Sequence, residues 1–472
     1  MPDLDIRNQS HLIFEDLLAS AMEQNNPTVI AGYPMTNMDI RDANIPVRLD
    51  MLAHTIGIAT APLEIKFDLS DMHLIEAVAL ANCNIDASGG VIVQLGKTDG
   101  DIGTWEETHN LFHNYRNLLA NPDCEDYIDL TSPPNDPAAE PVDGTVELKG
   151  FVIVPGSGDC VVMAKAYLAD SDKPDELAKY VNRVYGDFRY RQIGAVDCYV
   201  ATVSQFGIYN VGDVIDFRFD WRMTATSGIK EVLIFEFSDA FALLNAVSIK
   251  SYSGSYPANW EEVIGQYVVT NANCRYIAII LKQDGAATIN DSIQFDNFRM
   301  SINKEVEDFI SAMVKTSLDR YIFKRFDHTI PAQFIKFILV NGWLLSASVD
   351  DYVEFGRILI GKCLSYGVQR GLSRDTLSGY SVELTSGNSP IEIKNKGQNK
   401  SFNCSFRAFK RGEASNIVEV LESLQGNQVF YSLFGESGKD RAILGNITSG
   451  VKITESSIKN IVDVNFSVVR ES

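Results

Sequence analysis

Apolar and polar residues alternate along most of this chain, which is the pattern of β-strands that bury one face. The clearest example is Val214–Met223, where charged residues separate the apolar side chains of Ile215, Phe217, Phe219 and Trp221. The apolar side chains of such a strand face a core, and the charged ones face outward. The alternation therefore predicts a mainly β protein.

Strands of this kind fall into three regions. They are His54–Thr60, Leu63–Asp68, Leu74–Ala81 and Val91–Leu95; then Val146–Val154, Cys160–Leu168, Asp197–Gln205, Val214–Met223, Glu231–Phe237, Gln266–Thr270, Arg275–Leu281 and Ser292–Ser301; then 380–387, 389–395, 401–409, 427–434, 441–447, 450–456 and 460–471. The spacing of the middle set predicts a two-sheet jelly roll, although a barrel fits the same spacing.

Four segments have helical spacing instead: 10–24, 104–120, 304–323 and 414–424. The first predicts an amphipathic N-terminal helix, and Thr104 followed by Glu107 indicates a capping box at the start of the second. Residues 121–144 hold five of the fifteen prolines and predict a linker or extended surface arm.

Two apolar runs in the last third of the chain, Phe334–Val340 and Tyr352–Ile360, are separated by a polar turn-forming segment. This pattern predicts a buried hairpin. Residues 31–96 contain the opening strands of a sandwich without closing strands nearby, whereas the hairpin has closing strands without a beginning. We infer that the chain leaves one domain and returns to it, an inference that also draws on a family resemblance given below.

The 472 residues are 45% apolar and 22% charged, which is a globular composition. This length predicts about two to four domains. The net charge of −21 opposes binding to nucleic acid and to anionic bilayers, and no Lys/Arg-rich stripe counteracts it. We expect no signal peptide and no membrane insertion. The seven cysteines are dispersed without a CxxC pair, which favours folding in a reducing cytoplasm.

Motifs for catalysis and metal binding are weak. His109 and His113 have i, i+4 spacing but lack the HExxH arrangement, and Gly435–Asp440 lacks the glycine and hydroxyl residue of a P-loop. The acid pairs Asp350–Asp351 and Asp216/Asp220 fit a turn and a solvated strand face. We expect no enzymatic activity, no metal and no cofactor.

Aromatic residues are the better functional candidates, because exposed rings on a jelly roll can stack on the apolar faces of sugars. Tyr252, Tyr256 and Trp260 lie in or beside the loop-like segment SYSGSYPANW, and Tyr209 lies in another loop-like context. These four residues form our candidate carbohydrate-binding set. Trp221 is assigned to the core, since it alternates with Phe217 and Phe219.

Three segments, AGYPMTN (Ala31–Asn37), Pro62–Ile85 and DYVEFGRILIGK (Asp351–Lys362), resemble a family of tailed-phage and prophage virion proteins. The resemblance covers about residues 25–100 and 330–472, and it implies a discoidin-like β-sandwich followed by a β-rich C-terminal domain. Residues 105–325 interrupt the family pattern. This insertion is similar to jelly-roll carbohydrate-binding modules through Trp260–Gly285 and the closing SIQFDNFRMS.

We therefore expect a mainly β fold, in which a split discoidin-like β-sandwich carries an inserted jelly roll and precedes a C-terminal β-rich domain. The expected segments are 1–104, the first part of the sandwich with the N-terminal helix; 105–144, a connector; 145–302, the jelly roll; 303–330, a helical connector; 331–361, the closing hairpin; and 362–472, the C-terminal domain.

The expected function is that of a non-enzymatic structural component of a bacteriophage tail, which docks through its sandwich and C-terminal domain and projects the jelly roll outward. The alternative is a virion protein that binds host-surface glycans. The expected partners are other tail proteins, further copies of this chain and a host glycan. The expected location is the virion tail, assembled in the bacterial cytoplasm.

Overall fold

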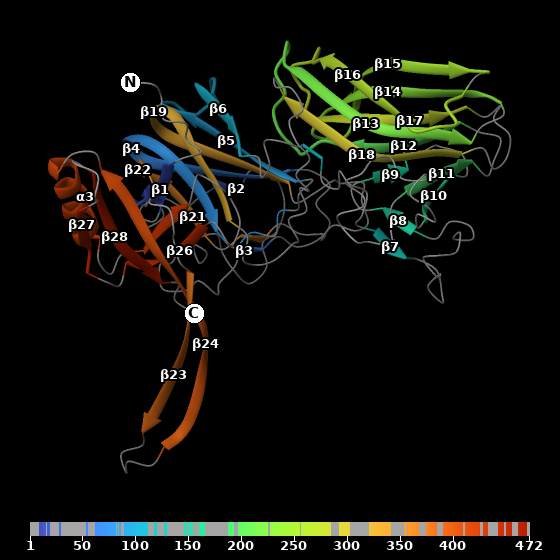
Figure 1. Cartoon of the computed structure of the whole chain (residues 1–472). Coiled ribbons are helices and arrows are strands. Elements are labelled where there is room, and N and C mark those ends of the chain that lie inside the picture. Colours follow the sequence, from blue (N-terminus) through green and yellow to red (C-terminus); the bar gives the residue numbers. More distant parts are fainter. Residues whose placement is uncertain are drawn as a thin grey trace.

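The structure of the protein is a computed structural model (Figure 1). The residues that it describes are 9–15, 17–18, 28–29, 53–54, 62–81, 83, 85, 89–111, 118–119, 127–129, 146–148, 151–153, 160–165, 187–192, 197–224, 227–254, 256–284, 292–302, 321–340, 354–355, 357–367, 374–384, 390–408, 411–424, 428–432, 442–447, 450–455 and 461–469. In this part of the chain the fold is mainly β, with antiparallel sheets and one named helix, α3 (Arg411–Ser423). The predicted fold class is confirmed.

One six-stranded sheet, which we call the β4 sheet, joins segments that are far apart in the sequence. Its strands are β2 (Thr28–Val29), β4 (Leu63–Ala81), β19 (Tyr321–Val340), β5 (Gly90–Gly96), β6 (Glu107–Asn110) and β21 (Arg357–Gly361). β19 lies between β4 and β5 and pairs with both. The chain thus returns, after more than 200 residues, to a sheet that it began before residue 100.

Three local predictions are wrong in this sheet. Within the described residues, β19 and β21 do not form a hairpin with each other, because each pairs with β4. Glu107–Asn110 is a strand on β5 and not part of a capped helix. Tyr321–Phe323, the end of the predicted 304–323 helix, belongs to β19, and residues 304–320 lie outside the described part. In each case pairing with another strand of the sheet overrides the local periodicity.

The predicted strands Leu63–Asp68 and Leu74–Ala81 are one continuous strand, β4. Its register against β19 shifts between Asp68 and His73, and Ser70 has a positive φ of 67° in this bulge. A bulge admits extra residues into one strand without ending it, which is why the polar segment does not separate two strands.

Two five-stranded sheets face each other across a shared core between Phe151 and Ile302. The β14 sheet has the order β15 (Leu243–Ser253), β14 (Ile229–Phe237), β17 (Tyr276–Gln283), β12 (Cys198–Val203) and β9 (Phe151–Ile153); the β13 sheet has the order β10 (Cys160–Lys165), β11 (Asp187–Gln192), β18 (Ser292–Ile302), β13 (Val214–Thr224) and β16 (Glu261–Val268). The two-sheet prediction is confirmed. Phe217, Phe219 and Trp221 are completely buried, as their alternation predicts.

Two strands of the sandwich, β11 and β15, were not predicted from the sequence. β15 is an edge strand that pairs only with β14, and none of its side chains is fully buried. A strand of this kind lacks the strict alternation of apolar and polar residues that marks a strand with one buried face. It nevertheless contributes side chains to the candidate site.

The outer face of the β14 sheet packs against the β4 sheet. Ile92, Ile338 and Val340 share an apolar cluster with side chains of the β14 sheet, including Phe206 and Tyr276. Beside this cluster, the side-chain amide of Asn110 forms two hydrogen bonds with the backbone of Ile208: its Nδ2 donates to the Ile208 carbonyl at 2.8 Å, and its Oδ1 accepts from the Ile208 N–H at 2.6 Å. Buried apolar contact together with a paired hydrogen bond restricts the orientation of the two sheets.

An eight-stranded sheet, which we call the β24 sheet, contains the C-terminal region. Its order is β23 (Arg374–Leu384), β24 (Pro390–Ala408), β22 (Cys363–Gly367), β1 (Gln9–Ile13), β25 (Gln428–Ser432), β26 (Ala442–Ile447), β28 (Val462–Val469) and β27 (Lys452–Glu455). β24 also pairs with β28, which closes six of these strands into a ring. Helix α3 buries Ala414, Ile417 and Leu421, in agreement with the predicted helix.

The N-terminal prediction is wrong for Gln9–Ile13, which form β1 between β22 and β25 and not a helix. Leu12 and Ile13 are fully buried in the sheet. Their apolar side chains therefore fit a buried strand as well as they fit the apolar face of a helix. Leu17 and Leu18, further along the predicted helix, are helical and buried.

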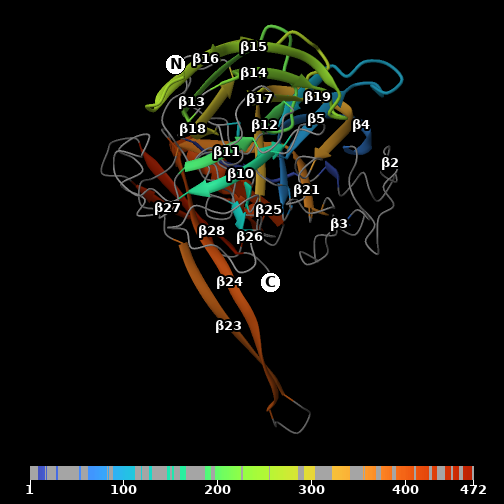
Figure 2. The same cartoon turned by 90° about the vertical axis from the view of Figure 1, so that its right-hand side faces the viewer.

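β23 and β24 form a two-stranded ribbon that extends well beyond the remaining elements (Figure 1, Figure 2). The predicted strands 389–395 and 401–409 are both within β24.

Two pairs of short strands complete the described sheets: β7 (Tyr127–Asp129) with β8 (Val146–Leu148), and β20 (Glu354–Phe355) with β3 (Ala53–His54). β7 lies in the predicted linker 121–144, whose other residues are outside the described part, as are His113, Ala31–Asn37 and Gly435–Asp440. None of the described helical residues forms a segment that is long and apolar enough to cross a membrane.

Candidate functional site

The structure brings together three of the four predicted aromatic residues. Tyr252 lies near the end of β15, and Tyr256 and Trp260 lie in the connection from β15 to β16. All three side chains are half-buried. β15 and β16 are edge strands of opposite sheets, so this connection crosses the open side of the sandwich.

Tyr209, the fourth predicted residue, does not belong to this group. It is completely buried in the sandwich core, and its hydroxyl donates to the Gln205 carbonyl at 2.7 Å. A ring without exposed surface cannot stack on a ligand. This assignment is therefore wrong, because a loop-like sequence context does not reveal whether the loop folds back over the core.

A carboxylate and an ammonium group connect the two edge strands. The Tyr252 hydroxyl donates to the two Glu261 oxygens at 2.8 and 2.7 Å, and the Lys250 ammonium donates to Glu261 Oε1. Lys250 and Tyr252 belong to β15, and Glu261 is the first residue of β16. These charge-assisted bonds hold the two sheets together at their open side.

The ionisation of this trio follows from its contacts. Burial favours the neutral form of Glu261, but the hydrogen bonds from Lys250 and Tyr252 and the charge of Lys250 outweigh it and lower the pKa of the carboxyl group. Burial likewise opposes the charge of Lys250, yet its bond to Glu261 raises the pKa of the ammonium group. Burial raises the pKa of Tyr252. Near neutral pH the trio is therefore carboxylate, ammonium and neutral phenol.

Each aromatic ring of the group has a cation near its face. Arg222 lies 5.0 Å from the Trp260 ring centroid, the Lys230 ammonium 5.3 Å from that of Tyr256, and the Lys250 ammonium 5.3 Å from that of Tyr252. Such contacts stabilise the cation and fix the ring. We call Arg222, Lys230, Lys250, Tyr252, Tyr256, Trp260 and Glu261 the aromatic–cation cluster.

The members of the cluster differ in their contacts with the rest of the protein and in the exposure of their side chains. Tyr252 packs edge-on against the buried Trp221 at 5.4 Å, and the Tyr256 hydroxyl donates to the Gly228 carbonyl. Lys230 is completely buried and donates to the Ser227 carbonyl at 2.7 Å. Lys250 and Glu261, by contrast, keep 31% and 36% of their side-chain surface exposed. A ligand can therefore reach Lys250 and Glu261, whereas Lys230 acts only through its charge.

Arg222 places Trp260 at the outer face of the β13 sheet. Arg222 lies between the buried Trp221 and Met223 on β13, so its side chain points away from the core. Its Nε donates to Gln294 Oε1 on the neighbouring strand β18. The cluster thus combines aromatic surface with donors and acceptors at the junction of the open side and this face.

Four members of the cluster were not predicted from the sequence: Arg222, Lys230, Lys250 and Glu261. Alternation already places Arg222 on the outer face of its strand, but the contact with Trp260 depends on a pairing between β13 and β16 that a local pattern does not contain. Lys250 belongs to the strand that was not predicted.

The described residues contain no group of three or more His, Cys, Asp or Glu side chains suited to a metal ion. His109 belongs to strand β6 and not to the predicted helix 104–120, and His113 lies outside the described part. Its Nε2 lies 3.2 Å from Glu107 Oε2, and its ring packs at 4.6 Å on Phe326. Burial lowers the pKa of His109 despite the nearby Glu107 carboxylate.

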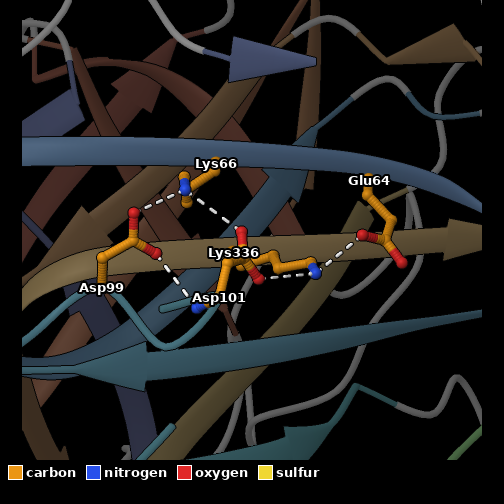
Figure 3. A network of polar contacts seen from close by, with 5 residues as sticks. All are labelled: Glu64, Lys66, Asp99, Asp101 and Lys336. Atoms are coloured by element: carbon orange, nitrogen blue, oxygen red, sulfur yellow. Dashed lines mark hydrogen bonds and ion pairs between the residues drawn. The ribbon is translucent and has the colours of Figure 1, made fainter. Parts of the chain in front are cut away.

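A second polar network lies on the β4 sheet (Figure 3). Lys66 binds Asp99 at 2.6 Å and Asp101 at 3.1 Å, while Lys336 binds Glu64 at 2.7 Å and Asp101 at 3.1 Å. Lys66 and Lys336 are direct cross-strand neighbours, an arrangement that would be repulsive without the carboxylates.

This network fastens the loop 97–106 to the sheet. Asp99 and Asp101 come from the loop, and the Lys97 amide donates to Glu106 Oε2 at 2.8 Å. The Trp105 ring lies against Gly100, where a Cβ atom would approach it to 2.3 Å. Every charge in the network has an opposite partner, so we assign it a structural role and not a ligand-binding one.

The sequence matches no protein-family model, and it matches no curated protein. Solved structures with some similarity include an arabinose-bound GH51 α-L-arabinofuranosidase (12% identity, TM-score 0.27), for which the match covers 40% of this chain and 26% of that chain. The CBM22-1 xylan-binding domain of Paenibacillus barcinonensis Xyn10C (10% identity, TM-score 0.23) is matched over 33% of this chain and 87% of that chain.

The enzymatically active domain of bacteriophage CBA120 tailspike protein 4 (9% identity, TM-score 0.25) is matched over 33% of this chain and 20% of that chain. The match therefore spans about a quarter of the arabinofuranosidase chain and a fifth of the tailspike chain. Other similar structures are carbohydrate-binding modules of families 4 and 29. At TM-scores below 0.3 these similarities assign neither a fold family nor a function.

Proposed function

We propose that the protein binds a glycan through the aromatic–cation cluster, and that the remainder of the chain is a non-enzymatic scaffold. The observation that carries this proposal is the grouping of Tyr252, Tyr256 and Trp260 with charged hydrogen-bonding groups at the open side of one sandwich. Protein sites for small polar ligands combine aromatic surface with a few placed polar groups in this way.

The chemistry of sugars fits this grouping. A pyranose ring has an apolar face of C–H groups that can stack on an indole or phenol, and hydroxyls around its rim that need donors and acceptors. Trp260 supplies ring surface, Glu261 supplies acceptor oxygens, and Lys250 supplies donors. The internal hydrogen bonds of the cluster hold these side chains in place before a ligand arrives, which reduces the entropy lost on binding.

The test is a glycan screen with the full-length protein, followed by affinity measurements on the polymers that bind. Trp260→Ala should weaken binding by about tenfold or more, as for other central aromatic anchors. Trp105→Ala is the matched control, since Trp105 is also half-buried but lies in the 97–106 loop. Failure to bind any glycan in the screen would rule out the proposal.

A second function, that of a structural subunit in a phage tail, is favoured by the β23–β24 ribbon. Before Ser401, β24 pairs with no strand of the described residues except β23. An isolated two-stranded ribbon is only marginally stable in water, so it gains from contact with another subunit. We propose that further copies of this chain or other tail proteins supply this contact, in line with the family resemblance of the sequence.

The mass of the full-length protein in solution, measured by light scattering, tests this assembly proposal together with electron microscopy of particles. A closed oligomer located on a tail would support it. A stable monomer that is absent from particles would contradict it and would leave the glycan proposal in place.

We also propose that the cluster does not cleave its ligand. A catalytic general acid needs a raised carboxyl pKa, whereas the bonds from Lys250 and Tyr252 lower the pKa of Glu261. Incubation of the full-length protein with each bound polymer should release no reducing ends. Release that Glu261→Gln abolishes would overturn this point.

A further inference from the structure

The ion pair of the aromatic–cation cluster presents a fixed pattern of hydrogen-bonding groups. The lowered pKa of the Glu261 carboxyl group and the raised pKa of the Lys250 ammonium group keep both side chains charged near neutral pH. A carboxylate only accepts hydrogen bonds, and an ammonium group only donates them. A ligand that binds both side chains must therefore offer an acceptor and a donor together.

The bonds within the trio of Lys250, Tyr252 and Glu261 leave one position on each charged group. A carboxylate has about four acceptor positions. In Glu261, Oε1 accepts from Lys250 and Tyr252, and Oε2 accepts from Tyr252 at 2.7 Å. Among the described residues, no further donor bonds to Oε2. The Lys250 ammonium has three N–H groups, of which the contacts with Glu261 and Tyr252 use two.

Both side chains are open to a ligand, since 31% of the Lys250 surface and 36% of the Glu261 surface are exposed. Lys250 is bound at Oε1, whereas the unused acceptor position is on Oε2. The width of the carboxylate therefore separates the remaining donor from the remaining acceptor. Two neighbouring oxygen atoms of a ligand fit this separation better than a single atom does.

We propose that the cluster recognises two adjacent hydroxyl groups on one sugar ring, of which one accepts from Lys250 and the other donates to Glu261. This inference rests on the proposed glycan-binding function. A hydroxyl group both donates and accepts, so two adjacent hydroxyls satisfy the ammonium and the carboxylate at the same time. An isolated hydroxyl leaves one of the two charged groups without a ligand partner after water is displaced, which weakens binding by about tenfold.

Polymers of one sugar that differ only in linkage test this proposal. In a (1→4)-linked chain of glucose, galactose or mannose, the hydroxyls at C2 and C3 are free and adjacent. In a (1→3)-linked chain, the free hydroxyls are at C2, C4 and C6, and none of them are adjacent. We would measure the affinity of the full-length protein for high-mass polymers of both linkages. We expect the (1→4)-linked polymer to bind about tenfold more tightly for at least one sugar.

Variants assign this preference to the ion pair. Glu261→Gln should lower the affinity for the (1→4)-linked polymer to that for the (1→3)-linked one, because an amide group has one acceptor oxygen and not two. Lys250→Met should have the same effect, and Lys250→Arg should keep the preference, since a guanidinium also donates. Glu262→Gln is the matched control: Glu262 is the next residue and pairs with Arg218 at 2.8 Å, outside the cluster. It should change either affinity less than twofold.

The preference between linkages is the decisive measurement, because a variant that only loosens the sandwich weakens binding of both polymers alike. If the (1→3)-linked polymers bound the wild-type protein as tightly as the (1→4)-linked ones, or if none of these polymers bound, the inference would be overturned. Binding of any other glycan in the wider screen would still support the proposed function. A loss of preference in Glu262→Gln as large as in Glu261→Gln would also overturn the inference.

Discussion

Asp101 is the residue on which the polar network of the β4 sheet depends most (Figure 3). Its two carboxylate oxygens each lie 3.1 Å from an ammonium group, one from Lys66 and one from Lys336. The substitution Asp101→Asn keeps the shape of the side chain and removes its charge. It leaves two directly opposed lysines with only Asp99 and Glu64 to compensate them.

The expected loss follows from the exposure of the pair. Lys336 keeps only 10% of its side-chain surface exposed and Asp101 keeps 29%. Removing one partner of a fully buried ion pair costs about 3–5 kcal/mol, and an exposed pair contributes about 0–1 kcal/mol. The present pair lies between these limits, and one amide oxygen can still accept from a lysine. We therefore expect Asp101→Asn to reduce the free energy of unfolding of this sheet by about 1–2 kcal/mol.

The loss should be localised. Hydrogen exchange followed by mass spectrometry should show faster exchange of the amides in 97–106, where the Ile102 and Gly103 amides donate to the Asp99 carbonyl at 3.1 Å. A local measurement is preferable to a global melting curve, because a chain with several sheets need not unfold in two states. The peptides from α3 and β25 should be unchanged, since they lie in the β24 sheet region.

The pH dependence has a definite sign. Burial opposes the charge of Asp101, but the bonds to Lys66 and Lys336 lower the pKa of its carboxyl group. A lowered pKa contributes stability above the ordinary value of 3.8 and loses it as the pH falls through the folded-state value. The difference between the wild type and Asp101→Asn should therefore be constant near neutral pH and shrink below pH 3.8.

Asp71→Asn is the matched control, because Asp71 is exposed on β4, the strand of Lys66, and has no hydrogen bond or ion pair with the described residues. It should leave exchange unchanged. If Asp101→Asn exchanged at the wild-type rate in 97–106, or if Asp71→Asn had the same effect, the network would not hold the loop and the reasoning would be refuted.

Further changes test the sandwich and the β24 sheet. Gly265→Ala puts a Cβ atom 2.3 Å from the Phe217 ring and should lower stability by about 1–3 kcal/mol, whereas Gly412→Ala, with open space in α3, should raise it by about 0.5–1 kcal/mol; thermal unfolding measures both. Deleting residues 1–15 removes β1 and should expose the β24 sheet to limited proteolysis. Burial raises the pKa of the Cys404 thiol well above its ordinary value, so alkylation at pH 8 should require unfolding.

Most strands were predictable because their signal is local. Val214–Met223 alternates in sequence and buries its apolar face in the structure, and 414–424 has helical spacing and forms most of α3. The failures also have a local cause. Residues 10–13 satisfy helical spacing and strand burial equally well, so only pairing with β22 and β25 selects the strand.

The sequence by itself determined the β class and the stretch of chain that holds three aromatic candidates, because each depends on residues that are close together. The choice of a two-sheet sandwich over a barrel came from the structure. Tertiary structure alone decided that β19 enters between β4 and β5, that Tyr209 is buried, and that Arg222 and Lys250 meet the rings of Trp260 and Tyr252. The register between strands sets these contacts, and a pattern along one strand carries no information on which strand lies beside it.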